Sequence, residues 1–355
     1  MITLFGATGY TGQLIARALE RRGLPFRLAG RSLAKLQALS QSLASHPPTL
    51  VADVGTPSSL TALFDNTRLL INGVGPFTDL GEPVVALAAA RGIHYLDITN
   101  ELAYVYRMQQ YNRLARQTGA AIVPACGFEV AVADCAVAAL VRERASPIKD
   151  ITIVYYLGGS GVSIGTRLSG LRTFATSWLA YRAGKYVGDA PGGQVKRGTI
   201  NGRPFAAINF PSAEVVTLPA HTPTRNIYTW MAISRRTAGA VSVVMPLVGI
   251  LLRTPLGWLT AAVLRRVNAL PDETTRVADR WSIKIEMTGG ENTHSQVWSG
   301  KDAYGLTGEI IAYAAQALTR DGYANRGVLA PAQALEPEKF LEWLSGMPEV
   351  TVKNE

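Results

Sequence analysis

The first third of the chain alternates between short apolar runs and segments with helical periodicity. Six runs have lengths typical of buried parallel strands. They lie at residues 2–5, 25–30, 49–53, 69–77, 94–101 and 120–129. Between them, apolar residues recur every three or four positions at 13–19, 32–44, 58–64, 83–91 and 103–118. This regular alternation predicts an α/β fold with a doubly wound parallel sheet of the Rossmann type.

From about Pro147 the pattern changes to alternating, β-branched segments, which predict a second α+β domain built on a mixed sheet. Its expected strands lie at 148–157, 195–199, 204–210, 226–234, 281–287 and 293–299, with a helix at 165–183. Asn201-Gly202 joins two of these strands as a type I′ hairpin. We therefore expect a Rossmann domain at 1–135, a substrate or oligomerisation domain at 136–302, and a C-terminal return of 303–355, with a helix at 305–319, to the Rossmann domain.

The turn after the first strand carries three glycines spaced three apart, in the stretch Gly6, Ala7, Thr8, Gly9, Tyr10, Thr11 and Gly12. Gly6 permits a tight bend, Gly9 lets the backbone approach a pyrophosphate, and Gly12 lets the helix pack closely on the strand. The helix N-terminus then faces the phosphates. This stretch predicts a dinucleotide site, against the alternative of a merely structural glycine-rich turn.

The second strand ends in Gly30-Arg31-Ser32, where an NAD site would place an acidic residue. The guanidinium of Arg31, the hydroxyl of Ser32 and the ammonium of Lys35 suit a ribose 2′-phosphate, so NADP (NADPH) is the predicted cofactor. The alternative is that Arg31 and Lys35 simply begin a solvated helix. Further cofactor contacts are expected at the ends of the third and fourth strands, from Asp53, Val74, Gly75 and Pro76.

Composition fits an enzyme of ordinary type. The chain has 355 residues and a formal charge of +9, which suits an anionic cofactor, an anionic substrate or an anionic membrane surface. No aromatic-rich basic cluster points to nucleic acid. The only cysteines, Cys126 and Cys135, indicate neither a disulfide nor a metal site. Because the chain starts directly in a strand, we expect no signal peptide and a cytoplasmic location.

An apolar segment at 238–264 stands apart from the rest of the second domain. Residues 238–252 carry no charge, and Arg235-Arg236 and Arg265-Arg266 flank the segment. Arg253, Pro246 and Pro255 interrupt it, which argues against a transmembrane helix. Two interpretations stay open: a buried core or homodimer contact, and a surface that touches a membrane or admits an acyl chain.

Catalytic candidates follow the later strands of the Rossmann domain. They are Tyr95, Asp97, Thr99, Glu101 and Glu129. The four histidines fall in unrelated contexts. Hydride transfer needs no stronger signature, because the nicotinamide carries the chemistry and the protein supplies position and a proton. The alternative for Tyr95 and Asp97 is that they satisfy buried backbone groups, and Asp134 serves equally well as a cap or ion-pair partner.

Together these residues resemble the saccharopine dehydrogenase-like reductases, especially their bacterial branch of trans-acting enoyl reductases. The resemblance rests on the glycine turn at 6–12, on 72–77, on 95–101, on 126–129 and on 327–332. Asn100, Glu129 and Ala330 depart from the family's pattern. The resemblance implies an NADP-dependent oxidoreductase that reduces an enoyl or related lipid- or polyketide-type substrate.

Two other functions stay open. The first is an amino-acid-type, saccharopine-like dehydrogenase, for which Arg167, Arg172 and Arg225 are candidates to bind substrate carboxylates. The second is a non-catalytic, dinucleotide-binding protein that associates with lipid through 238–264. The expected partners are a small-molecule, lipid-like substrate and a second copy of the chain, and peripheral membrane contact through 238–264 is one of the two open interpretations of that segment.

Overall fold

The computed structural model describes residues 1–142, 148–158, 164–176, 179–190, 192–236, 238–252, 254, 273–289 and 292–355. These residues form two compact units. The Rossmann unit comprises Met1–Thr99, Tyr104–Ala131 and Tyr304–Leu335. The second unit comprises Asn100–Ala103, Val132–Ala303 and Glu336–Glu355.

The Rossmann unit is built on a parallel sheet with the strand order β15-β6-β5-β4-β1-β2-β3. The strands are β1 (Ile2–Phe5), β2 (Phe26–Gly30), β3 (Thr49–Val51), β4 (Leu69–Asn72), β5 (His94–Asp97), β6 (Ala121–Val123) and β15 (Gly327–Val328). The order 3-2-1-4-5-6 is that of a doubly wound Rossmann sheet, whose direction of winding reverses between β1 and β4. The predicted fold class is therefore confirmed.

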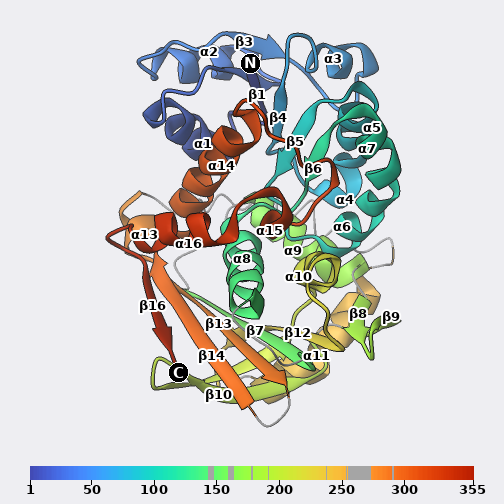
Figure 1. Ribbon diagram of the computed structural model, residues 1–355, viewed down its shortest axis with the longest axis vertical. Helices are drawn as coiled ribbons and strands as arrows, with labels where there is room; N and C mark the ends of the chain where they lie inside the picture. Colours follow the sequence, from blue (N-terminus) through green and yellow to red (C-terminus); the bar gives the residue numbers. More distant parts are fainter. Residues whose placement is uncertain are drawn as a thin grey trace. The chain divides into compact units, whose positions relative to one another are not determined.

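Helices connect these strands (Figure 1). They are α1 (Tyr10–Arg21), α2 (Leu33–Gln41), α3 (Pro57–Ala62), α4 (Phe77–Leu80), α5 (Glu82–Arg91), α6 (Leu102–Met108), α7 (Asn112–Thr118) and the start of α8 (Phe128–Arg142). In α1 the residues Gly12, Ile15, Ala16, Ala18 and Leu19 are buried. Their spacing of three and four places them on one face, which packs on the sheet.

A late helix, α14 (Ala303–Thr319), returns to lie against α1. A Cβ atom added at Gly308 would lie 3.0 Å from the carbonyl oxygen of Leu14, so the two helices are in close backbone contact. Arg21 and Glu309 form an ion pair at 2.5 Å beside this contact. The chain after α14 continues through β15 and α15 (Pro331–Ala334).

The second unit has a mixed sheet with the order β10-β11-β12-β7-β13-β14-β16. Its strands are β7 (Asp150–Leu157), β10 (Val195–Ile200), β11 (Arg203–Asn209), β12 (Asn226–Ile233), β13 (Arg280–Gly289), β14 (Asn292–Lys301) and β16 (Thr351–Asn354). Strands β12 and β7 pair in parallel and the other neighbours are antiparallel. Asn201 and Gly202 have φ angles of 52° and 70°, as the predicted type I′ hairpin requires.

This sheet curls until the β10–β11 turn reaches β14. The side-chain amide of Asn201 donates to Ser299 Oγ at 3.0 Å. Lys284 Nζ donates to the carbonyl oxygen of Thr199 at 3.0 Å and to Glu355 Oε2 at 2.9 Å. The curl encloses a small core of Val154, Ile200, Phe205, Ala207, Trp230 and Val297.

Two predictions of local structure were wrong. The helix expected at 165–183 ends earlier, as α9 (Ile164–Thr176), and Leu179–Arg182 is the strand β8, which pairs with β9 (Lys185–Gly188). Ala183 and Gly184 form its turn, with φ angles of 50° and 78° that a helix does not contain. The expected return of 303–355 also differs: Glu336–Glu355, with α16 (Pro337–Ser345), belongs to the second unit, because β16 pairs with β14.

The apolar segment begins as one helix, α11 (Ala238–Leu251). It packs against α9 and the β10–β11 hairpin of the same unit. Arg253 and residues 255–264 of the predicted apolar segment lie outside the described residues. Among the helices that the structure describes, none is long and apolar enough to cross a membrane.

Candidate functional site

The glycine turn joins β1 to α1 with almost no space between backbone segments. Gly6 has a φ angle of 81°, which favours glycine. A Cβ atom at Gly12 would lie 2.2 Å from the carbonyl oxygen of Gly6, so only glycine lets α1 start this close to the turn. Gly9 is the N-cap of α1 and has no side-chain cap. The helix therefore presents its N-terminus at the carboxyl end of β1, where a pyrophosphate binds in Rossmann domains.

The turn after β4 lies directly against the glycine turn, on the other side of the point where the strand order reverses. A Cβ atom at Gly6 would lie 2.9 Å from the carbonyl carbon of Gly73 and from Val74 Cγ2. Asn72 Oδ1 accepts a hydrogen bond from the backbone N–H of Val74 at 2.9 Å, which holds this turn. The structure thus brings Gly6–Gly12 and Val74–Pro76 to one place, as a dinucleotide site requires.

The predicted 2′-phosphate corner lies beside the same turn. A Cβ atom at Gly30, the last residue of β2, would lie 3.8 Å from Thr8 Oγ1. Arg31 and Lys35 are exposed, so both cations are open to a ligand. Ser32 is the N-cap of α2, and its Oγ accepts from the backbone N–H of Lys35 at 3.4 Å. Its hydroxyl has a structural role that the sequence analysis did not foresee.

Asp53 lies at the same edge, just after β3. Its Oδ1 accepts from the backbone N–H of Gly55 at 2.9 Å, so the carboxylate closes its own turn. Strand β3 pairs with β2 such that Val51 lies opposite Gly30. Asp53 therefore follows the strand next to Arg31, and its contact with the adenine end of a cofactor stays a prediction.

Tyr95 and Asp97 belong to a fully buried hydrogen-bond network at the end of β5. Asp97 Oδ2 accepts from the hydroxyls of Tyr95 and Tyr104, each at 2.9 Å. Asp97 Oδ1 accepts from the backbone N–H groups of Ala125 at 2.8 Å and Thr99 at 3.1 Å. All four acceptor positions of the carboxylate are filled by groups of the protein. This geometry supports the structural alternative for Tyr95 and Asp97.

Burial sets the protonation behaviour of this network. Desolvation raises the pKa of Asp97 to about 6, although its hydrogen bonds with Ala125, Thr99 and the two tyrosines act in the opposite direction. Desolvation, reinforced by the charge of Asp97, also raises the pKa of Tyr95 and of Tyr104. Tyr104 was missed in the sequence, because nothing in a predicted helix marks which residue turns toward a strand end.

The remaining acidic candidates lie in different units. Glu129 is half-buried in the first turn of α8, directly after β6, and belongs to the Rossmann unit. Glu101 is buried in the second unit, where Glu101 Oε1 accepts from Ser169 Oγ at 2.6 Å. The five candidates therefore do not form one cluster within either unit, and only Glu129 lies both at the carboxyl edge of the sheet and partly exposed.

The second unit contains a buried acidic cluster around Glu214, which sequence analysis missed. The hydroxyls of Tyr155 and Ser212 both donate to its carboxylate. Asn100 Oδ1 accepts from Ser212 Oγ at 2.9 Å and from the backbone N–H of Ala213 at 2.8 Å. The departure at Asn100 thus has a structural purpose: its amide anchors the segment that carries Glu214.

Asp134 pairs with a histidine, as one of its two expected roles required. Asp134 Oδ1 accepts from Thr217 Oγ1 at 2.7 Å and lies 3.1 Å from His221 Nε2. Burial alone lowers the pKa of His221, but the charge and hydrogen bond of Asp134 outweigh it, so the pKa is raised.

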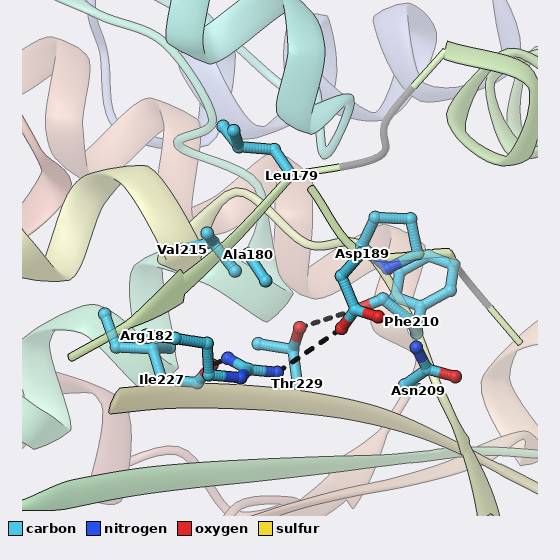
Figure 2. A pocket seen from close by; sticks show the side chains of 10 residues that line it. Leu179, Ala180, Arg182, Asp189, Asn209, Phe210, Val215, Ile227 and Thr229 are labelled. Carbon is cyan, nitrogen blue, oxygen red and sulfur yellow. Dashed lines mark hydrogen bonds and ion pairs between the residues drawn. The ribbon is translucent and has the colours of Figure 1, made fainter. Parts of the chain in front are cut away.

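Figure 2 shows a small cavity in the second unit, and this cavity is too small for a substrate. Its volume is about 20 Å³, room for a single water. Arg182 crosses it to Asp189 Oδ2 at 3.4 Å, and the hydroxyl of Thr229 donates to the carbonyl oxygen of Phe210 at 2.5 Å. The other walls are largely apolar, from residues such as Leu179, Val215 and Ile227.

Two further sets of residues bear on other oxidoreductase chemistries. Tyr181 and Lys185 have the Tyr-x-x-x-Lys spacing of short-chain dehydrogenases, but they lie on opposite strands of the β8–β9 hairpin rather than on one helix face. Of the three arginines considered for substrate carboxylates, Arg225 is exposed before β12, and the side chains of Arg167 and Arg172 lie outside the described residues.

The fold and the turn geometry define a class, the dinucleotide-binding Rossmann proteins. Residues 2–123 match the saccharopine dehydrogenase NADP binding domain, and NADP is accordingly the cofactor. The predicted family resemblance is confirmed. The glycine turn and the 2′-phosphate corner beside it fit such a dinucleotide, because a side chain in the glycine turn would fill the space that the phosphates need.

Curated relatives agree with this assignment. The chain is 35% identical over 195 residues to a trans-acting enoyl reductase of Mycobacterium ulcerans, a match that covers 51% of this chain and 47% of the relative. It is 35% identical over 185 residues to a trans-acting enoyl reductase of Mycobacterium tuberculosis, covering 50% and 41%. The chain therefore spans about half the length of the curated relatives it matches.

Similarity of fold extends over the whole chain. Saccharopine dehydrogenase (L-Glu forming) from Saccharomyces cerevisiae superimposes with a TM-score of 0.64 at 13% identity, covering 100% of this chain and 99% of that one. At this identity the likeness shows the fold alone. It includes the second, mixed-sheet unit as well as the Rossmann unit.

Proposed function

We propose that this protein is an NADPH-dependent oxidoreductase that reduces the carbon–carbon double bond of an enoyl or related lipid- or polyketide-type substrate. The observation that carries the proposal is the corner formed by Thr8, Gly30 and Arg31 beside the glycine turn. The names of the two curated relatives support the substrate class.

The Rossmann unit supplies the cofactor site in this proposal. The N-terminus of α1 would hold the pyrophosphate, and Arg31, through its forked guanidinium, and Lys35 would hold the 2′-phosphate. When bound, NADPH supplies the hydride. The residues of the chain hold the cofactor at the carboxyl edge of the sheet and provide the proton that completes the reduction.

Glu129 is the proposed proton donor. It is half-buried in the first turn of α8, where β6 meets the carboxyl edge of the sheet. Tyr95 and Asp97 are less suited to this role, because both are fully buried and engaged with one another and with Tyr104. We assign them to holding the strand ends of β5 and β6 in place.

Calorimetric titration tests the cofactor part of the proposal. NADPH should bind at least about tenfold more tightly than NADH, which corresponds to roughly 1.4 kcal/mol from a charge-assisted phosphate contact. Arg31→Ala should remove most of this preference. Arg17→Ala, which changes an exposed arginine elsewhere on the same unit, is the matched control. Equal affinities for both nucleotides in the wild type would refute the 2′-phosphate site.

Steady-state kinetics tests the reaction. The protein should oxidise NADPH when given an enoyl thioester, and Glu129→Gln should lower kcat by roughly 10²-fold or more while the Kd for NADPH stays unchanged. Saccharopine with NADP⁺ serves as the alternative substrate. Turnover of saccharopine and none of the enoyl thioester would replace the proposed activity by the amino-acid-type dehydrogenase.

A further inference from the structure

Helix α11 presents an aliphatic stripe to solvent. Five of its residues are far more exposed than apolar side chains in a core: Val243 at 68%, Val244 at 52%, Leu247 at 63%, Ile250 at 53% and Leu251 at 48%. With 3.6 residues per turn, these positions fall within an arc of about 120° on one side of the helix. They constitute the α11 stripe.

The other side of α11 is already used. It packs against α9 and against β10 and β11, and Ala238 at its start is fully buried. The helix is therefore anchored in the second unit, and its stripe is an external surface of that unit. A contiguous exposed apolar surface of this kind marks an interaction site rather than ordinary surface variation.

The charge of the surrounding sequence indicates the partner. Arg235 and Arg236 lie exposed just before α11. Residues 215–271 contain six arginines and neither aspartate, glutamate nor lysine. A second copy of the chain seated on the stripe would bring another set of these arginines and no acidic residue from the same segment. An anionic lipid surface offers both the apolar phase and the opposite charge.

We propose that the α11 stripe, with Arg235 and Arg236, docks the protein onto an anionic membrane surface. The helix lies in the interface plane, with the stripe among the acyl chains and the two arginines at the head groups. This is peripheral binding, since α11 is too short to span a bilayer. It also brings an enzyme for lipid-like substrates to the phase in which such substrates gather.

Vesicle flotation tests the proposal on the 355-residue chain. Wild type should float with vesicles of equimolar phosphatidylcholine and phosphatidylglycerol at low salt, and much less with phosphatidylcholine alone. Binding should weaken at high salt, because the Debye length falls from about 10 Å at 0.1 M to about 3 Å at 1 M. Equal binding to both vesicles, or no binding to either, would overturn the proposal.

Two pairs of substitutions separate the apolar and the charged parts. The double variant Leu247→Gln, Leu251→Gln should lower the partition coefficient at least about tenfold. Its control is Val277→Gln on α13 (Glu273–Ala278), because Val277 is exposed at 48%, as is Leu251. The double variant Arg235→Gln, Arg236→Gln should lower binding at least about fivefold, whereas Arg17→Gln with Arg113→Gln should not.

NADPH affinity and light scattering complete the test. All four variants should bind NADPH and keep the tryptophan fluorescence of the wild type, which shows that the Rossmann unit and the second unit are folded. If the Leu247→Gln, Leu251→Gln variant floats as well as the wild type, the stripe is not the membrane contact. A different outcome is that the wild type does not bind vesicles and that light scattering gives the variant half the molecular mass of the wild type. In that case the stripe is an interface between copies of the chain, and the lipid proposal is wrong.

Discussion

The buried carboxyl of Asp97 makes the stability of the Rossmann unit depend on pH in an unusual direction. Burial raises its pKa from an ordinary value of 3.8 to about 6. A group whose pKa is higher in the folded than in the unfolded state stabilises the fold fully below its unfolded pKa. This contribution is lost as pH rises through its folded pKa. The relevant window is therefore pH 4 to 7.

The size of the effect follows from the pKa difference. A difference of about 2 units at 1.36 kcal/mol each corresponds to about 3 kcal/mol between pH 4 and pH 7. Asp97→Asn removes the titration, while the amide oxygen still accepts from the backbone N–H groups of Thr99 and Ala125. We expect the wild type to lose about this much stability relative to the variant as pH rises through the window.

Amide hydrogen exchange measures the effect in the right place. Thr99 and Ala125 donate their N–H groups directly to Asp97, so peptides that cover them report opening of the network. Exchange rates are corrected for the intrinsic effect of pH and compared between wild type and Asp97→Asn. Asp321→Asn, which alters a fully exposed carboxylate of the same unit, is the control. A wild-type-minus-variant difference in the free energy of opening that is flat, or that grows with rising pH, would refute the argument.

Three further outcomes are expected. Gly12→Ala should destabilise the Rossmann unit by roughly 1–3 kcal/mol, measured by hydrogen exchange, because its Cβ would lie 2.2 Å from the Gly6 carbonyl oxygen. Gly9→Val should instead leave a folded chain that no longer binds NADPH in a fluorescence titration. His221 has a raised pKa, so the second unit should lose stability as pH rises through that pKa from 6.5 upward. Urea unfolding followed by tryptophan fluorescence detects this, since the tryptophans that the structure describes, Trp230, Trp281, Trp298 and Trp343, lie in the second unit, and His221→Gln should abolish the pH dependence. Gly308→Val should separate α14 from α1 and lower stability by roughly 1–3 kcal/mol, an effect that Gly239→Val, with open space around its Cβ, should not reproduce on the Rossmann unit.

The sequence by itself was enough for the Rossmann unit because its signals are local. Strand, glycine turn and helix follow one another within about twenty residues. Each glycine of the turn stands where the backbone needs a positive φ angle or a close approach that other residues do not allow. The absence of an acidic residue after β2 and the presence of Arg31 identified the cofactor in the same way. The hairpin at Asn201-Gly202 could be predicted equally well, because a type I′ turn needs positive φ angles at two adjacent residues and Asn-Gly adopts them readily.

Tertiary structure decided what depends on contacts between distant segments. Nothing local marks Tyr104 as the partner of Asp97, or Asn100 as the anchor of Ser212 and Ala213, since these pairs form only when strands and helices pack. Strand β16 joined the second unit because β14 offered an unpaired edge. Leu179–Arg182 forms strand β8 instead of the end of the predicted helix because it pairs with β9 and β12. The period of the apolar residues in α11 was visible in the sequence, but only packing against α9, β10 and β11 determined which side of the helix faces solvent.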